Sequence, residues 1–157
     1  PFFLDKRGSG ELPITDEKMT RFNITLDEGV DMVVYAVENA WGGELYVPKI
    51  PSYKINDVAK AIDPNAKLNI VGIRPGEKLH EEMITDTDAL NTIDLGKYFA
   101  ILPAISFIYS EEDYMVHHKA VKVPFGFKYN SKINSEWETV QTLQQLILEH
   151  IDSNFKV

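Results

Sequence analysis

The sequence has no cysteine among its 157 residues, which excludes disulfide bonds, thiolate metal sites and a thiol nucleophile. It also lacks any apolar run near the roughly 20 residues that a membrane helix requires, and it shows no signal-peptide pattern. Basic residues are not in excess either, because the formal net charge is −8, which argues against a nucleic-acid partner. We therefore expect a cytoplasmic chain with no membrane contact. A small anionic ligand held by a few local arginines remains compatible with this charge.

The composition that is present is that of an ordinary globular protein, with 44% hydrophobic and 25% charged residues. The length suits one compact domain, so we expect a single region over residues 1–157. The chain opens at Pro1 and runs directly into the apolar stretch Phe2–Leu4. We expect a cut through a larger protein here, with a processed amino terminus as the alternative.

Periodicity and capping patterns predict alternating helices and strands, and hence an α/β fold. Thr25 and Glu28 form a capping-box pattern that predicts a helix ending at Gly42-Gly43, and Ser135 with Glu138 predicts a second box before a terminal helix. The segment Asp86–Gly96 is polar and is expected to be mostly loop. Further helices are expected at 55–62 and 77–84, and strands at 44–47, 68–73 and 98–102; the segment 12–14 is expected to be a short strand or loop.

The segment that most suggests binding chemistry is Gly72–Lys78, in which Arg74 follows a strand and precedes a Pro-Gly turn. A guanidinium held on such a stiff support can bind two phosphate oxygens at once. Glu77 lies one turn further on and could accept hydrogen bonds from neighbouring sugar hydroxyls. A plain surface turn with exposed charges would give the same pattern, and spacing alone does not separate the two.

A second candidate segment comprises Pro13, Ile14 and Thr15, followed shortly by Arg21 and Phe22. The extended piece could offer backbone groups to a flat base, with Ile14 and Phe22 as apolar walls. Arg21 could supply a second positive charge for a diphosphate. The alternative is that the apolar residues belong to the core and Arg21 to a surface ion pair.

Both segments also carry a resemblance to a known family. The runs Pro13–Phe22 and Gly72–Ile84 (GIRPGEKLHEEMI) resemble extended short-chain dehydrogenase/reductase enzymes of the polysaccharide biosynthesis protein family. They are most similar to inverting UDP-N-acetylglucosamine 4,6-dehydratases of pseudaminic acid synthesis. Gly43–Lys49 and Tyr129–Trp137 share this similarity, so it spans nearly the whole chain.

The resemblance implies a role for each candidate residue. Arg74 would contact the pyrophosphate of a UDP-sugar, and Arg21 would also face the phosphates. Glu77 would bind the ribose, and Pro13, Ile14 and Thr15 would lie near the uracil. The implied partner is UDP-N-acetylglucosamine, and the implied intact enzyme is an NADP-dependent lyase that forms homo-oligomers.

The family's catalytic motifs are missing from this chain. There is no glycine-rich dinucleotide loop, no Tyr-x-x-x-Lys pair and no Thr-Asp-Lys triplet. The resemblance therefore implies the C-terminal, nucleotide-sugar-binding portion of a Rossmann-type enzyme. NADP would be bound by an N-terminal half that this sequence does not contain. We expect no cofactor and no catalytic residue in these 157 residues, and no activity from them alone.

Two other functions remain open: a nucleotide-sugar epimerase fragment, and a free-standing binding or assembly module without catalysis. A metal site is not expected. His80 lacks a second histidine at the i+4 position, where Ile84 stands, and the adjacent His117 and His118 would point in different directions.

Overall fold

The computed structural model describes residues 2–105 and 108–156; Pro1 lies outside them. Its chain forms two compact units, which are treated separately here. The first unit takes in Pro1–Asn23, Pro51–Glu81 and Ser131–Val157, and the second takes in Ile24–Ile50 and Glu82–Asn130. Helices alternate with parallel and antiparallel strands, which confirms the predicted α/β class. The expectation of a single substrate-binding region stays a prediction.

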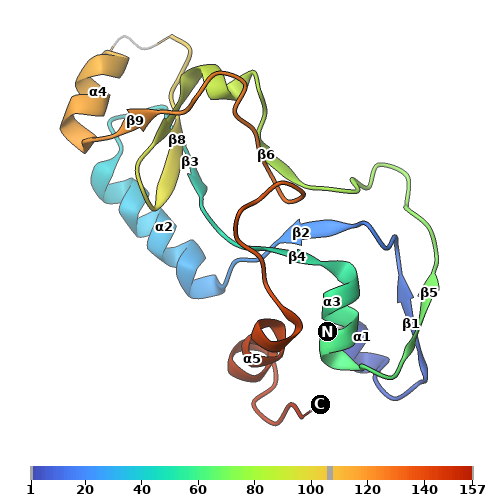
Figure 1. Ribbon diagram of the computed structural model, residues 1–157. Coiled ribbons are helices and arrows are strands. Elements are labelled where there is room, and N and C mark those ends of the chain that lie inside the picture. Colours follow the sequence, from blue (N-terminus) through green and yellow to red (C-terminus); the bar gives the residue numbers. More distant parts are fainter. Residues whose placement is uncertain (1, 106–107, 157) are drawn as a thin grey trace. The chain divides into compact units, whose positions relative to one another are not determined.

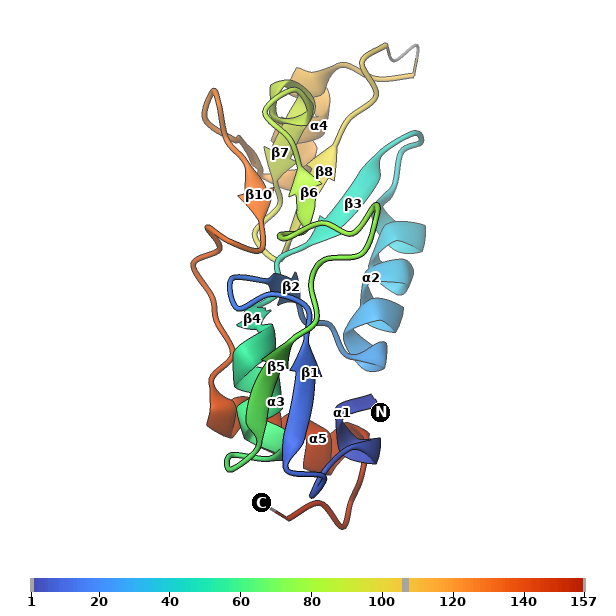
Figure 2. The same ribbon diagram turned by 90° about the vertical axis from the view of Figure 1, so that its right-hand side faces the viewer.

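The first unit contains a parallel pair of strands, β1 (Glu11–Ile14) and β5 (Lys67–Ile70), which run side by side in Figure 2. Helix α3 (Ile55–Ile62) packs against this pair. Leu12 and Ile14 of β1 and Ala59 of α3 are fully buried together and form one core of the unit. Parallel strands need a crossover connection, and α3 lies within the segment that joins β1 to β5.

A second core of the same unit lies on another face of α3, where α5 (Val140–His150) and α1 (Phe2–Asp5) pack. Ile62, Ile147 and Phe155 are buried there, with Phe3 and Leu4 packed against them. Figure 1 shows α1, α3 and α5 gathered near the two chain ends. Segments from the start, middle and end of the sequence therefore share this core.

Strand β2 (Thr20–Phe22) pairs antiparallel with β4 (Ser52–Lys54) in the first unit. Residues after Ser131 run beside β4, where the Glu138 amide donates to the Ser52 carbonyl at 2.7 Å. The Ser52 amide donates to the Glu136 carbonyl at 2.9 Å. The C-terminal segment is thus attached along β4 before α5 begins.

The second unit contains a four-stranded antiparallel sheet in the order β3-β8-β7-β9. These strands are β3 (Leu45–Pro48), β8 (Tyr98–Ile101), β7 (Thr92–Asp94) and β9 (Val121–Lys122). A separate pair joins β6 (Glu82–Ile84) to β10 (Tyr129–Asn130). The core of the unit comprises Ile93, Ala100, Leu102 and Tyr114.

Its helices are α2 (Leu26–Asn39), α4 (Glu111–His118) and the 3-10 helix η1 (Asp88–Asn91). The capping box predicted at Thr25 and Glu28 is confirmed, because each side chain accepts from the other residue's backbone amide. The fourteen residues of α2 are all described and none is buried. Leu26 and Val37 are more than four-fifths exposed in this chain, and Val30, Val33 and Val34 are at least half exposed.

Three local predictions are wrong. No helix covers 77–84; this stretch is irregular up to the short strand β6, which pairs with β10. The terminal helix is capped by Thr139 and Thr142 rather than by Ser135 and Glu138. Asp86–Gly96 holds η1 and β7 instead of mostly loop. In each case a contact with a distant segment outweighs the local pattern: Glu81 accepts from the Phe22 amide, Glu138 joins β4, and β7 pairs with β9.

The other predicted elements are confirmed with small shifts in their ends. Helix α3 matches its prediction at 55–62, and strands β3 and β8 lie within one residue of theirs. The strand expected at 68–73 stops earlier, at Ile70, although the Val71 amide still donates to the Ile14 carbonyl at 2.8 Å. Beyond that bond the chain leaves the sheet towards Arg74.

Candidate functional site

Arg21 lies in the centre of β2, and its guanidinium is held from several sides. Nη1 donates to the carbonyls of Thr20 at 2.8 Å and Leu79 at 3.3 Å. Nη2 contacts Glu77 Oε1 at 3.4 Å, and Nε lies 3.6 Å from Glu81 Oε1. The side chain is only 16% exposed. Two carbonyls and two carboxylates thus hold this positive charge in place. This is the ion-paired arrangement that the alternative interpretation of Arg21 expected, although the side chain is largely buried.

Glu77 connects Arg21 to the Arg-Pro-Gly turn. Its Oε1 contacts Arg21, while its Oε2 accepts from the Arg74 backbone amide at 3.2 Å. The Glu77 amide donates in turn to the Arg74 carbonyl at 3.0 Å. Gly76 adopts a φ of 81°, a conformation that favours glycine and closes the turn. The Glu77 carboxylate therefore stabilises the Arg-Pro-Gly turn and also helps to hold the Arg21 guanidinium in position.

Arg74 itself is exposed at this turn. Within residues 2–105 and 108–156, its guanidinium has no ion-pair partner, in contrast to that of Arg21. A single exposed arginine next to a fixed one can bind an incoming anion without first breaking an internal pair. Glu77 thus contacts the Arg21 side chain and the Arg74 backbone, and joint binding of a ligand by the two arginines stays a prediction.

The third candidate segment lies at the end of β1. Ile14 is 1% exposed and packs in the core with Leu12 and Ala59, so its side chain does not form a surface wall. Pro13 and Thr15 are partly exposed. Strands β1 and β5 are parallel, and Ile14 pairs with Ile70 at their carboxyl ends. Thr15 and the loop that leads to Arg74 therefore leave the strands at the same edge. In open α/β sheets, ligands bind at such carboxyl ends of parallel strands.

A hydrogen-bonded group that sequence reasoning missed lies beside this site. Thr20 Oγ1 is 2.8 Å from His80 Nδ1 and 2.7 Å from Ser131 Oγ, and Ser131 Oγ also accepts from the Glu81 amide at 2.9 Å. Thr20 and Ser131 are buried. The only sequence signal was that both the His80 and Ser131 runs belong to the family resemblance. This group joins β2, the segment after the Arg-Pro-Gly turn and the start of the C-terminal segment.

Burial lowers the pKa of His80, and the positive charges of Lys132 and Arg21 lower it further, against an opposing effect of Asp16. The imidazole is therefore biased towards its neutral form, in which Nδ1 can exchange a hydrogen bond with the Thr20 hydroxyl. A neutral imidazole does not repel the Arg21 guanidinium. With His80 neutral, the positive charge at this site comes from the arginines and not from the imidazole.

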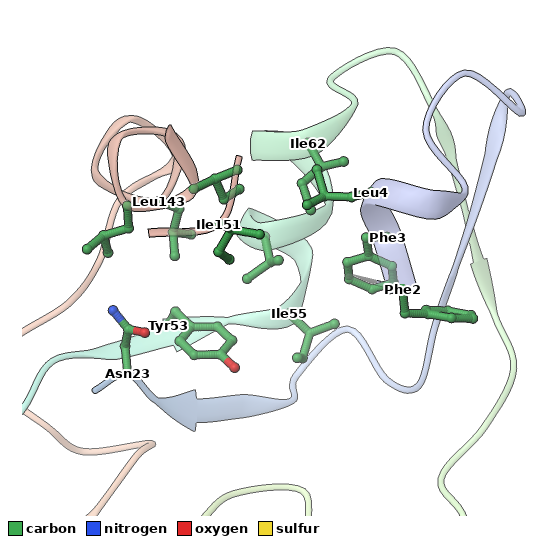
Figure 3. Close-up of a pocket in the computed structure, with 12 residues that line it drawn as sticks. Phe2, Phe3, Leu4, Asn23, Tyr53, Ile55, Ile62, Leu143 and Ile151 are labelled. Carbon is green, nitrogen blue, oxygen red and sulfur yellow. The ribbon is translucent and has the colours of Figure 1, made fainter. Parts of the chain in front are cut away.

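An apolar pocket of about 390 Å³ also lies in the first unit (Figure 3). Phe2, Phe3, Ile55 and Ile62 line it, and Tyr53 supplies one of its few polar groups. Burial raises the pKa of Tyr53, so its hydroxyl stays protonated. A pocket with no cation in its lining is not suited to a diphosphate.

Residues 2–105 and 108–156 contain neither a metal-binding cluster nor a membrane-spanning helix. No group of three or more His, Cys, Asp or Glu side chains in this part could hold a metal ion. No helix in the same part is long and apolar enough to cross a membrane.

Comparison with known proteins places these residues in a family context. Two inverting UDP-N-acetylglucosamine 4,6-dehydratases from strains of Campylobacter jejuni subsp. jejuni are each 45% identical over 152 residues, covering 94% of this chain and 46% of the relative. A UDP-glucose 4-epimerase of Rickettsia akari is 37% identical over 106 residues, covering 64% of this chain and 31% of the relative. The X-ray structure of Pen from Bacillus thuringiensis is similar at a TM-score of 0.76 and 27% identity, covering 94% of this chain and 44% of that one.

The chain spans about half the length of the dehydratases that it matches. The profile of the polysaccharide biosynthesis protein family matches residues 1–103, which include β1, β2 and the whole Arg-Pro-Gly turn. Since this match covers more than half of the sequence and contains every candidate residue, the chain belongs to the polysaccharide biosynthesis protein family.

Proposed function

We propose that this chain is the nucleotide-sugar-binding part of an inverting UDP-N-acetylglucosamine 4,6-dehydratase that serves surface-polysaccharide or flagellin-glycan synthesis. The observation that carries the proposal is 45% identity, along 94% of the chain, to two dehydratases of this activity. The epimerase relative matches less of the chain at lower identity, which favours dehydration over epimerisation. The grouping of two arginines and a glutamate in one unit supports a diphosphate ligand.

In this proposal the exposed guanidinium of Arg74 binds the pyrophosphate, and Arg21 supplies the second positive charge. Glu77 accepts hydrogen bonds from the ribose hydroxyls while it holds Arg21 at 3.4 Å. Pro13, Ile14 and Thr15 contribute backbone at the end of β1 to the uracil, because the Ile14 side chain is committed to the core. Charge-assisted bonds from a fixed guanidinium bring geometric specificity as well as affinity.

These residues do not fit NADP. The sequence has no glycine-rich loop, and the helix that directly follows a strand, α3, has Lys54 at its N-cap rather than a run of glycines. In related oxidoreductases that loop allows the pyrophosphate to approach a helix N-terminus. We propose that NADP is held by the half of the intact enzyme that lies outside these 157 residues. The present residues would then bind and orient the sugar nucleotide and transfer no proton or hydride.

The binding half of the proposal is tested by titrating UDP into the full 157-residue chain by calorimetry. Arg74→Ala should weaken binding at least about tenfold, the loss expected for one charge-assisted pair. Lys67→Ala is the control, because Lys67 lies on β5 in the same unit and is 82% exposed. Equal UDP affinity in the two variants would contradict the assignment of Arg74.

The activity half is tested on the longest reading frame that encodes this chain. Its product should convert UDP-N-acetylglucosamine to a 4-keto-6-deoxy sugar, whereas the 157 residues alone should bind without turnover. Epimerisation of the sugar nucleotide without loss of water would favour the epimerase alternative. Binding without any turnover by the longest product would favour the non-catalytic module. Cytoplasmic location and self-association of the intact enzyme belong to the same proposal, and cell fractionation and light scattering test them.

A further inference from the structure

A second pocket, of about 760 Å³, lies in the first unit and is lined mostly by polar residues. Lys18, Lys54 and Lys132 line it, together with His80 and Trp137. These residues come from the loop before β2, the end of β4, the segment after the Arg-Pro-Gly turn and the C-terminal segment. Three ammonium groups from three distant positions therefore converge on one pocket in a chain whose net charge is −8.

The positive charge of this pocket is only partly offset. Asp57 and Glu138 also line it, so three lysines face two carboxylates. Lys18 and Lys54 form no ion pair within residues 2–105 and 108–156. Lys54 Nζ lies 5.8 Å from the centre of the Trp137 ring, so its ammonium group rests at the wall of the pocket. An excess of positive charge in a pocket attracts an anion.

The start of α3 adds to this field. Lys54 is the N-cap of α3 and provides no side-chain cap hydrogen bond. The first amides of a helix carry the positive end of its dipole, which favours a bound anion. The Ile55 amide already donates to the Met19 carbonyl, and Asp57 lies in the first turn, so the helix adds only partly to the field of the lysines.

This pocket is separate from the proposed UDP-sugar residues. Arg21 and Thr20 are successive residues of β2, and successive side chains of a strand point to opposite faces. Thr20 lines the pocket, whereas Arg21, Arg74 and Glu77 lie outside its lining. The two sites share only the strand between them and the Leu79–His80 segment.

We propose that this pocket binds a small phosphate-bearing anion, held by Lys18, Lys54 and Lys132 against the Trp137 ring. The ammonium groups contact the phosphate oxygens as point charges, which suits a mobile phosphate better than a rigid bidentate fork does. The half-buried indole supplies a flat wall that accommodates either inorganic phosphate or the base of a nucleotide. This inference does not depend on the dehydratase activity.

The chain contains two tryptophans, Trp41 in the second unit and Trp137 at the pocket, so its indole N–H signals give a matched pair of NMR probes. Inorganic phosphate should shift the Trp137 signal in a saturable manner at millimolar concentration and leave the Trp41 signal in place. Sodium chloride at matched ionic strength is the solvent control. A shift that rises linearly, or equally with chloride, overturns the proposal.

Removing two lysines then tests their role. Lys18→Met with Lys54→Met should weaken phosphate binding at Trp137 about tenfold or more. Lys60→Met is the matched control, because Lys60 is an exposed residue of the same helix, outside the pocket. Unchanged phosphate affinity in the double variant overturns the proposal.

The source of the phosphate is resolved by repeating the titration with UMP in the Arg74→Ala background, which removes the proposed nucleotide-sugar contact. Tighter binding of UMP than of phosphate assigns the pocket to a nucleotide, and equal binding assigns it to a free phosphate group. Either result supports the pocket, and the Trp137 response stays informative even if the intact enzyme has no dehydratase activity. Failure of both probes to saturate overturns it.

Discussion

The two units of this chain use their polar groups differently. In the first unit, polar side chains from distant segments meet at a strand edge: Arg21 contacts Glu77, and Thr20 contacts His80 and Ser131. In the second unit, polar groups are enclosed in an aromatic cluster, where the Tyr46 and Tyr114 hydroxyls lie 3.1 Å apart. The first arrangement leaves charges available to a ligand, and the second stabilises a core.

The aromatic cluster of the second unit is defined by Trp41, Tyr46, Tyr109, Tyr114 and His118, whose rings contact one another. Burial and the nearby Glu44 carboxylate raise the pKa of Tyr109 to about 12, and burial also raises that of Tyr114. These hydroxyls therefore stay protonated at neutral pH and act as hydrogen-bond groups. The comparison is consistent with the ligand site proposed for the first unit and with a structural role for this cluster.

The largest effect is expected from Tyr114→Ala, because this ring is fully buried in the core of the second unit. Loss of a buried aromatic ring typically costs about 3–5 kcal/mol. Urea unfolding should show that loss, whereas Tyr114→Phe, which removes only the contact with Tyr46, should cost about 1 kcal/mol. If UDP affinity fell together with stability in Tyr114→Phe, the division of roles between the units would fail.

Ser131→Ala should have the next largest effect, this time in the first unit. The change leaves the Glu81 amide and the Thr20 hydroxyl without the Ser131 oxygen in a buried place. An unsatisfied buried polar group costs about 1–3 kcal/mol. Thermal unfolding measures the loss, and Ser135→Ala at an exposed position of the same segment is the control. Equal stability of the two variants would show that the polar group is not a structural element.

The N-caps of α2 and α5, one in each unit, should have a smaller effect on stability. Thr25→Ala and Thr139→Ala each remove a side-chain cap, which typically costs about 1 kcal/mol. Since α2 has no buried residue while α5 buries Leu143 and Ile147, the amides of α2 should lose more protection. Hydrogen exchange measures both helices in each variant. Equal loss of protection in the two helices would contradict this reasoning.

The smallest expected effect is the pH dependence contributed by His80 and His118, one in each unit. Burial lowers both pKa values, aided by Lys132 and Arg21 at His80 and by His117 at His118; Glu44 opposes the shift at His118. The unfolded chain then binds protons first, at about pH 6.5, so stability is full above that pH and falls as the pH drops towards the folded pKa.

NMR titration should give values below 6.5 for both imidazoles. Lys132→Met should raise the pKa of His80 only part of the way, because burial is the larger cause, and should leave His118 unchanged. A full return of His80 to its ordinary pKa would assign the shift to charge instead. Equal shifts of both histidines would contradict a local origin.

Local sequence signals predicted much of the fold. The Thr25 capping box, the 3.6-residue apolar period of α3 and the apolar run of β8 all acted within their own segments, and all three are confirmed. Local predictions were wrong where a distant segment supplied a competing contact. Ser135 and Glu138 had the spacing of a capping box, but Glu138 joins β4 and the cap lies at Thr139. The helix expected from Glu77 failed because Glu77 and Glu81 both contact β2.

Sequence by itself determined the family and the α/β class, because both follow from residue types and patterns at short spacing. It also singles out Arg21, Arg74 and Glu77, whose binding roles stay predictions. Tertiary structure alone decided that Ile14 lies in the core, that Thr20 and Ser131 meet across 111 positions, and that three lysines share a pocket. The physical reason is that strand register and chain crossover determine which distant side chains meet. Periodicity determines only which face of a segment each side chain occupies.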